Sequence, residues 1–535
     1  MANSKAITAK GTKSAKRSTL IYPAAFILPA LIMIACGIIF RFEAIVPYIV
    51  AYALAAAIPG FFLASKNYGM AALLTSIVFV VGIGGYVTAD NMLQRSGLLS
   101  DKAFVSALSS ALDKFPAFIT QNDLDDVKVL IFEGNYDNDY GSPIDGFKLT
   151  LGYDEALMYM KAENQDEYDN DTVEGYFKSA TSEIDISDYS SLAKFTNLEY
   201  ISVNQPNSFM YYYYGIAPSY LAKFNDFSFF ENMKSLKDLI IFNTAASDFA
   251  PLSGLTSLEN LSIQYCNVKD ASVFGNLTGL KSLNLAYAGI YDISFSSTLG
   301  NLTQLYLPGN QIENIDALKE LANLTDLVLN SNQIEDIAPI GGMSQLANLY
   351  LSNNQIKDTS ALSGLGLLET VYLSTNQIED ASPLFTNALL KNIDISENAL
   401  TQMSGIENCT SLETLYISGN QITDLTPLSG LENLANLYAD NNLIEDLSPL
   451  EQVISLADIS LANNQISDIS PLANLGNLTN VNLDENLIAD FSPLESLEEG
   501  GTSVSGRDNQ LIEYDDDDHD HEDEYGVQEE EIPEE

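Results

Sequence analysis

Residues 310–332 read NQIENIDALKELANLTDLVLNSN, and this stretch contains one full unit of the pattern that organises the chain. Apolar residues lie three apart from Ile312 to Leu327, and then two apart at Leu327 and Leu329. A spacing of two is typical of a β-strand, whereas a spacing of three suits a short 3-10 segment. The unit therefore predicts one short strand and one returning arc, and units must stack to bury their leucines.

An asparagine recurs every 22 residues in the same slot of the unit. The series runs through Asn310, Asn332, Asn354, Asn376, Asn398, Asn420, Asn442, Asn464 and Asn486, with a slipped copy at Asn509. Thr244, Cys266 and Ala288 occupy the three slots before it. A carboxamide both donates and accepts hydrogen bonds, so a ladder of asparagines can satisfy the backbone groups that are buried where each strand turns inward.

The pattern L-x-x-L-x-L-x-x-N-x-I followed by D-I-x-P-L resembles a leucine-rich repeat. Copies such as Ile466-Ser467-Asp468-Ile469-Ser470-Pro471-Leu472 resemble the 22-residue, internalin-like bacterial class. The resemblance implies an α/β leucine-rich repeat solenoid, with a parallel β-sheet on its concave face and short 3-10 or irregular arcs on its convex face. It also implies adhesion or recognition of a partner as the function.

The charge of the chain is large and unevenly distributed. The formal net charge is −49, from 24 basic and 73 acidic residues. An acidic body argues against binding to nucleic acid, which requires basic groups at the phosphates. It favours a cationic partner.

The first 88 residues predict a membrane anchor. Residues 1–19 form a basic tail, and three apolar segments follow within 20–88, at Leu20–Phe40, Ile45–Ala64 and Met70–Val87. As a helix the first would span roughly 31 Å, enough to cross a bilayer. The basic tail should stay in the cytoplasm. We therefore expect three transmembrane helices, a multi-pass protein of the cell membrane with the lipid bilayer as a partner, and extracellular repeats.

Composition and spacing divide the remaining chain into four segments. Residues 89–134 predict a helical cap leading into the first repeat, and 135–243 contain irregular repeats with acidic and tyrosine-rich insertions. Regular leucine-rich repeats occupy 244–512. Residues 513–535 are a low-complexity acidic tail that we expect to be disordered.

Residues for catalysis are scarce. The only histidines, His519 and His521, lie in the acidic tail, so no Ser-His or Cys-His nucleophile system can be built in the repeats. We expect no enzyme activity, no cofactor and no structural metal. The stretch Asp515–Glu524 could bind cations diffusely, but it lacks the ligand spacing of an EF-hand loop.

One outward-facing strand position is rich in tyrosine. The column reads Tyr306, Val328, Tyr350, Tyr372, Asp394, Tyr416, Tyr438, Ser460 and Asn482, and nearby outward positions hold Asp326, Asp440, Asp458 and Asp484. The tyrosines and Asp326, Asp440 and Asp458 form the candidate ligand-binding site on the concave face. Because tyrosine also suits strands and repeat copying would propagate it, a purely structural role stays open at this point.

Three functions compete on the sequence alone. The first is a membrane-anchored surface protein that binds a protein, peptide or glycan partner. The second is an intracellular regulatory scaffold, because the repeats also resemble those of a eukaryotic phosphatase-regulating leucine-rich protein. The third, a surface hydrolase, is disfavoured because no catalytic site is evident.

Overall fold

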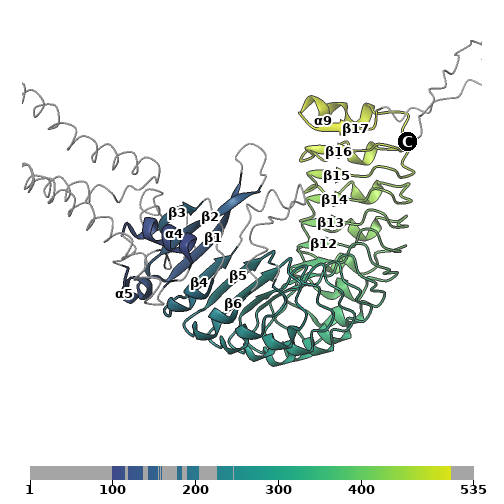
Figure 1. The fold of residues 1–535 in the computed structure, drawn as a ribbon. Helices are drawn as coiled ribbons and strands as arrows, with labels where there is room; N and C mark the ends of the chain where they lie inside the picture. Colours follow the sequence, from purple (N-terminus) through teal and green to yellow (C-terminus); the bar gives the residue numbers. More distant parts are fainter. Residues whose placement is uncertain are drawn as a thin grey trace, which may run out of the picture. The chain divides into compact units, whose positions relative to one another are not determined.

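The computed structural model describes residues 99, 101–114, 119–136, 143–154, 156, 158, 177–182, 189–203, 226–244 and 246–507 (Figure 1). The chain divides into two compact units, Met1–Gln333 and Ile334–Glu535. Each unit is a stack of repeats.

The second unit contributes one short strand per repeat. Its strands are β10 (Asn348–Tyr350), β11 (Thr370–Tyr372), β12 (Asn392–Asp394), β13 (Thr414–Tyr416), β14 (Asn436–Tyr438), β15 (Asp458–Ser460), β16 (Asn480–Asn482) and β17 (Ser503–Ser505). Neighbouring strands are parallel and in register, so that Leu349 lies opposite Val371 and Val371 opposite Ile393.

A 3-10 turn returns the chain from each strand to the next. These turns are η11 (Ala338–Ile340), η12 (Ser360–Gly364), η13 (Leu384–Thr386), η14 (Ile406–Asn408), η15 (Thr426–Leu428), η16 (Ser448–Leu450), η17 (Ser470–Leu472) and η18 (Ser492–Leu494). The short helix α9 (Glu495–Glu499) follows the last turn. Leu349 at the centre of β10 and Leu362 in η12 are both fully buried, so the core lies between strands and turns.

The asparagine of each repeat lies at the inward bend of the chain and joins neighbouring repeats. Asn376 Nδ2 donates to the carbonyl oxygen of Leu373 in its own repeat, at 2.9 Å, and to that of Leu351 in the preceding repeat, at 3.0 Å. Asn376 Oδ1 accepts the N–H of Ile356 at 3.0 Å. The carboxamide therefore satisfies backbone groups that the core would otherwise leave unpaired.

The first unit begins with two short helices, α4 (Lys102–Leu112) and α5 (Gln121–Asp125). Asp101 caps α4, because its side chain accepts the N–H of Phe104. The repeat strands that follow are β1 (Val129–Tyr136), β4 (Tyr200–Val203), β5 (Asp238–Phe242), β6 (Asn260–Gln264), β7 (Ser282–Asn284), β8 (Gln304–Tyr306) and β9 (Asp326–Val328). These seven strands are parallel and pair in that order.

The 3-10 turns of the first unit are η4 (Tyr189–Lys194), η6 (Ser228–Asn232), η7 (Ala250–Gly254), η8 (Ala271–Asn276), η9 (Ser294–Thr298) and η10 (Asp316–Glu320). Phenylalanines reinforce the core under these turns. The Phe249 ring packs against the Phe227 ring at 5.2 Å and the Phe274 ring at 6.1 Å between centroids.

Part of the acidic insertion is ordered as a hairpin. Strands β2 (Pro143–Gly152) and β3 (Phe177–Ser182) are antiparallel, and β2 pairs with the free side of β1. The sequence of this segment has no repeat spacing. However, β2 alternates apolar residues at Phe147, Leu149 and Leu151, which is the signal of a half-buried strand.

The predicted fold class was wrong in its membrane component. In the ranges that the structure describes, no helix is long and apolar enough to cross a membrane. The longest, α4, has 11 residues and so spans roughly 16 Å, about half the thickness of a hydrocarbon core. The basic tail 1–19 and the three helices expected within 20–88 lie outside the described residues. The multi-pass localisation and the bilayer as a partner are therefore unsupported, and the extracellular position of the repeats stays a prediction.

Candidate functional site

The candidate site lies on the outer face of the sheet in the second unit, which is the side that faces solvent and not the core. Each strand has three residues, and from β10 to β14 the middle one is buried while the two flanking ones are half-buried. The third positions form one column across successive strands: Tyr350, Tyr372, Asp394, Tyr416, Tyr438, Ser460, Asn482 and Ser505. We call the part of this column from Tyr350 to Tyr438 the tyrosine stripe.

The four tyrosines of the stripe form two ring pairs with different geometry. Tyr350 and Tyr372 meet edge to face, with ring centroids 5.1 Å apart and planes at 76°. Tyr416 and Tyr438 are stacked, with centroids 4.6 Å apart and planes at 6°. All four rings are half-buried, because each covers its neighbour while its outer edge stays in solvent.

Asp394 lies between the two ring pairs. Its Oδ1 accepts the N–H of Ser396 at 3.0 Å, which fixes the orientation of the carboxylate. Burial raises the pKa of the Tyr372 hydroxyl, and the nearby Tyr416, Tyr350 and Asp394 raise it further. The two tyrosine pairs and the carboxylate therefore share one local environment.

Two aspartates of the predicted site are engaged in bonds between strands. Asp458 Oδ2 accepts the hydroxyl of Tyr438 at 2.9 Å. Burial and this aspartate together raise the pKa of Tyr438 to about 12. Asp440 Oδ1 accepts the hydroxyl of Ser460 at 2.5 Å and the N–H of Ala462 at 2.7 Å. Both carboxylates help to fix the sheet, besides adding negative charge near the stripe.

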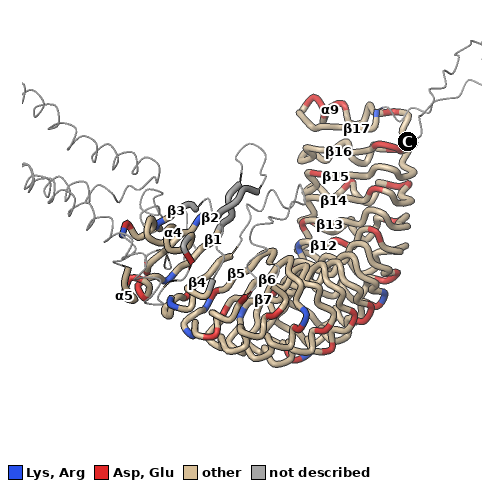
Figure 2. Tube along the Cα trace, in the orientation of Figure 1, with Lys and Arg blue, Asp and Glu red and all other residues tan. Residues whose placement is uncertain are grey.

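The second unit has almost no cations of its own. Residues 334–507 contain 24 acidic and three basic residues, and Figure 2 shows the acidic ones spread over the repeats. Each base already pairs with an acid: Lys357 with Glu335 at 3.7 Å, Lys391 with Glu369 at 2.7 Å, and Arg507 with Glu498. Among the described residues, no lysine or arginine pairs with Asp394.

Tyr306 and Asp326 of the predicted site belong to the first unit, and each is described there by itself. Tyr306 is half-buried at the end of β8. Asp326 begins β9 and accepts the hydroxyl of Thr325 at 2.7 Å. Their part in binding stays a prediction.

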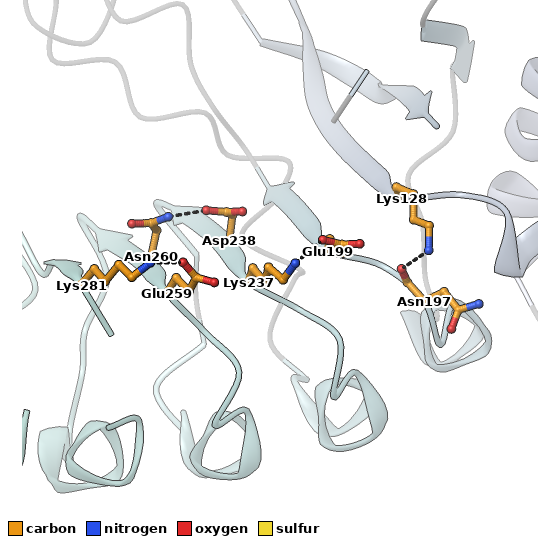
Figure 3. A network of polar contacts seen from close by, with 8 residues as sticks. All are labelled: Lys128, Asn197, Glu199, Lys237, Asp238, Glu259, Asn260 and Lys281. Atoms are coloured by element: carbon orange, nitrogen blue, oxygen red, sulfur yellow. Dashed lines mark hydrogen bonds and ion pairs between the residues drawn. The ribbon is translucent and has the colours of Figure 1, made fainter. Parts of the chain in front are cut away.

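The strand starts of the first unit carry a ladder of alternating charge (Figure 3). Lys237 pairs with Glu199 at 2.7 Å, and Lys281 with Glu259 at 2.6 Å. Between these two ion pairs, Asn260 of β6 donates to Asp238 of β5 at 2.5 Å. These contacts are partly exposed and contribute little stability, but the two lysines offset the charge of two carboxylates at this edge.

A further aromatic pair escaped the sequence analysis. The rings of Tyr265 and Tyr287 are stacked, with centroids 4.7 Å apart and planes at 6°. Both residues occupy the bend after the strand, where φ is positive, at 53° and 52°. The signal in the sequence is their 22-residue separation, at a bend position outside the strands.

Metal ligands and reactive thiols were the remaining candidates for chemistry in the sequence. No cluster of three or more His, Cys, Asp or Glu there could hold a metal ion. His519 and His521, and with them the acidic tail, lie outside the described residues. Burial raises the pKa of the Cys266 thiol to about 11 and that of Cys409 to about 12, so neither thiol is activated.

Comparison with known families identifies the repeats. A family model described as leucine-rich repeats in two copies matches residues 300–342, 344–386, 389–430, 410–452 and 454–496. No curated protein sequence matches the chain at a significant level.

Solved structures share the fold. An internalin (InlF) from Listeria monocytogenes is 24% identical, with a TM-score of 0.54, over 77% of this chain and 96% of that one. Internalin C2 from the same species is 36% identical over 39% of this chain and 82% of that one, with a TM-score of 0.32. The ectodomain of the receptor kinase GASSHO1/SCHENGEN3 from Arabidopsis thaliana, in complex with CASPARIAN STRIP INTEGRITY FACTOR 2, is 18% identical over 60% of this chain and 48% of that one, with a TM-score of 0.47. The fold assignment rests on the first of these.

Proposed function

We propose that this internalin-like leucine-rich repeat protein binds a protein or peptide partner through the tyrosine stripe on the outer face of its second unit. The observation that carries the proposal is the pairing of four half-buried tyrosines in one column, at 5.1 and 4.6 Å between ring centroids. Tyrosine offers a large contact area and a hydroxyl at a small cost in conformational entropy, which is why it is favoured in binding surfaces.

The preference of tyrosine for strands does not by itself explain the stripe. The first position of the same strands faces the same side, yet it holds asparagine, threonine or aspartate in β10 to β16. The preference of tyrosine for strands would apply to both columns. Aromatic rings are therefore concentrated in a single line, as a contact surface for an extended segment requires.

The negative charge around the stripe favours a partner with basic groups. All three bases of residues 334–507 are paired with acids, so the field of the surrounding carboxylates is not cancelled locally. Such a field speeds the approach of a cationic partner and weakens as salt is added.

The test is a capture experiment with the full chain as bait, beside the double variant Tyr350→Ala and Tyr372→Ala. We expect at least one protein that the parent chain retains and the variant does not. Its dissociation constant should rise roughly thirtyfold or more, equivalent to a loss of about 2 kcal/mol. Partner association should also slow as salt is raised.

Tyr291→Ala is the matched control, because Tyr291 is 71% exposed and lies outside the stripe. It should leave binding unchanged. A double variant with a normal thermal midpoint and unchanged partner binding would remove the stripe from the binding surface. If the chain binds to glycans on an array and captures no protein partner, a lectin function would replace the proposal.

A further inference from the structure

The tyrosine stripe contains one gap, at Asp394, which separates the two ring pairs. Strand β12, which carries Asp394, lies between β11 with Tyr372 and β13 with Tyr416. Since neighbouring strands are about 4.8 Å apart, these two tyrosines are anchored roughly 9.6 Å apart. A flat group between two rings needs about 7–8 Å, twice the usual contact distance between carbons. At the backbone, this spacing admits one flat group between the two side chains and not two.

One wall of the gap is the face of a ring. Tyr416 and Tyr438 stack at 6° with a centroid distance of 4.6 Å, close to the strand spacing. The two ring planes are therefore roughly perpendicular to the direction that leads from one strand to the next in the sheet. The face of Tyr416 that Tyr438 does not cover must look toward Asp394. On the opposite side, Tyr372 is close enough to Tyr416 and Asp394 for both to raise the pKa of its hydroxyl, after the larger effect of burial.

The floor of the gap is a carboxylate with remaining capacity to accept hydrogen bonds. Asp394 Oδ1 accepts the Ser396 N–H, and this is the only hydrogen bond to the carboxylate in the described structure. By contrast, Asp440 and Asp458 accept bonds from neighbouring strands. Of these three carboxylates, Asp394 is therefore the one that can best exchange its solvent contacts for a cationic ligand.

We infer that the gap between Tyr372 and Tyr416 accepts the guanidinium group of an arginine from the partner, with Asp394 as its counter-ion. The inference rests on the proposed function and names the chemistry of its central contact. A guanidinium is flat, stacks on aromatic faces and forms paired hydrogen bonds with a carboxylate. A lysine ammonium is compact and strongly hydrated, so it matches the carboxylate but not the flat gap.

The test uses the full chain and capped peptides of the form Gly-Ser-Gly-Arg-Gly-Ser-Gly. In matched peptides, lysine or citrulline replaces the arginine. Lysine keeps the charge, whereas citrulline keeps the flat shape without the charge. We expect the arginine peptide to bind at least fivefold more tightly than either, as measured by saturation-transfer NMR on the peptide. Asp394→Asn should abolish this preference, because it removes the charge and keeps the shape of the side chain.

Asp484→Asn is the matched control. It removes the same charge from an exposed position that lies on the same face but outside the tyrosine stripe. It should leave the arginine preference intact. Tyr416→Ala should abolish the preference, while Tyr416→Phe should keep it, because the ring face is retained. These two variants decide the question if Asp394→Asn proves unfolded by circular dichroism.

Equal binding of the arginine and lysine peptides would overturn the inference, as would a preference that survives Asp394→Asn in a folded chain. A captured partner that still depends on Tyr350 and Tyr372 would then leave the proposed function standing, with a different central contact. If partner binding does not depend on Tyr350 and Tyr372 but the arginine peptide is still preferred, the proposed function is refuted and the inference about the gap stands.

Discussion

Replacing Asn442 by alanine tests how much the asparagine ladder contributes to stability. The side chain is 5% exposed. Its Oδ1 accepts the N–H of Ile422 at 3.0 Å, and its Nδ2 donates to the carbonyl oxygens of Ile417 at 3.0 Å and Ala439 at 3.2 Å. Asn442→Ala removes all of these bonds from a position that water cannot readily reach.

The magnitude follows from counting which backbone groups lose their last partner. The Ile417 carbonyl keeps a bond from Asn420, and the Ala439 carbonyl keeps one from Asn464, both at 3.0 Å. The Ile422 N–H has no other acceptor in the described structure. One orphaned buried donor costs about 1–3 kcal/mol, and the weakened carbonyls add a smaller amount. We expect a loss of about 2 kcal/mol in the free energy of unfolding.

The chain itself shows how part of this loss can be recovered. Ala288 occupies the same slot naturally, and there the Val268 N–H donates to the Ala288 carbonyl oxygen at 3.0 Å. Asn310 of the next repeat also accepts the Ala288 N–H, at 3.1 Å. A similar rearrangement around Asn442→Ala would bring the cost toward the lower end, about 1 kcal/mol.

Thermal unfolding of the full chain by circular dichroism measures the effect. A loss of 2 kcal/mol should lower the midpoint by roughly 4–8 °C in a unit of this size. Hydrogen exchange should also accelerate at the Ile422 amide. The matched control is Asn480→Ala, at an exposed strand position, which should change stability by less than about 0.5 kcal/mol. Equal midpoints for the two variants would refute the hydrogen-bonded ladder as a source of stability.

Two further predictions concern the turns of the repeats. Asp468 accepts the Ser470 N–H at 2.9 Å, and this bond lowers the pKa of the Asp468 carboxyl. The stabilisation is therefore present at neutral pH and is lost as pH falls below about 4. Asp468→Asn should reduce the drop in thermal midpoint between pH 5 and pH 3. Gly309 has φ of 66°, and a Cβ there would overlap the ring of Tyr287; Gly309→Ala should cost about 1–2 kcal/mol in thermal unfolding, and Tyr287→Ala in the same chain should recover part of that loss. A full-sized loss that Tyr287→Ala does not relieve would mean that the backbone angle alone determines the cost.

The repeats could be predicted from sequence because each one is encoded locally. Leu327 and Leu329, two residues apart, are enough to indicate a strand, and the 22-residue period then fixes which residues of neighbouring strands lie opposite each other. The β2–β3 hairpin could not be found in this way, since it occurs once and pairs antiparallel with β1. Its alternation from Phe147 to Leu151 was visible, but the repeat period gave it no support.

The position of the tyrosines was predictable from the same period, whereas their geometry was not. Sequence spacing places Tyr350 beside Tyr372 and Tyr416 beside Tyr438 in equivalent positions. It does not distinguish the edge-to-face contact of the first pair from the stacked contact of the second. That difference depends on side-chain torsions and on neighbours such as Asp458, which holds the hydroxyl of Tyr438.

Departures from the repeat separate the scaffold from the candidate site. At the position two residues beyond the strand, Asp440 occurs where earlier repeats have serine. A second change, in the next strand, compensates for the added charge, because Ser460 donates to the Asp440 carboxylate at 2.5 Å. A paired change of this kind stabilises the sheet and needs no ligand to explain it. Asp394 also departs from its column, but its carboxylate has only the local bond from Ser396. A half-buried anion between aromatic rings gives up part of its hydration, and one local hydrogen bond compensates for that loss only in part. An arginine from outside would supply that partner, which is why the unmatched departure at Asp394 is a better guide to the binding contact than the tyrosines that the repeats copy around it.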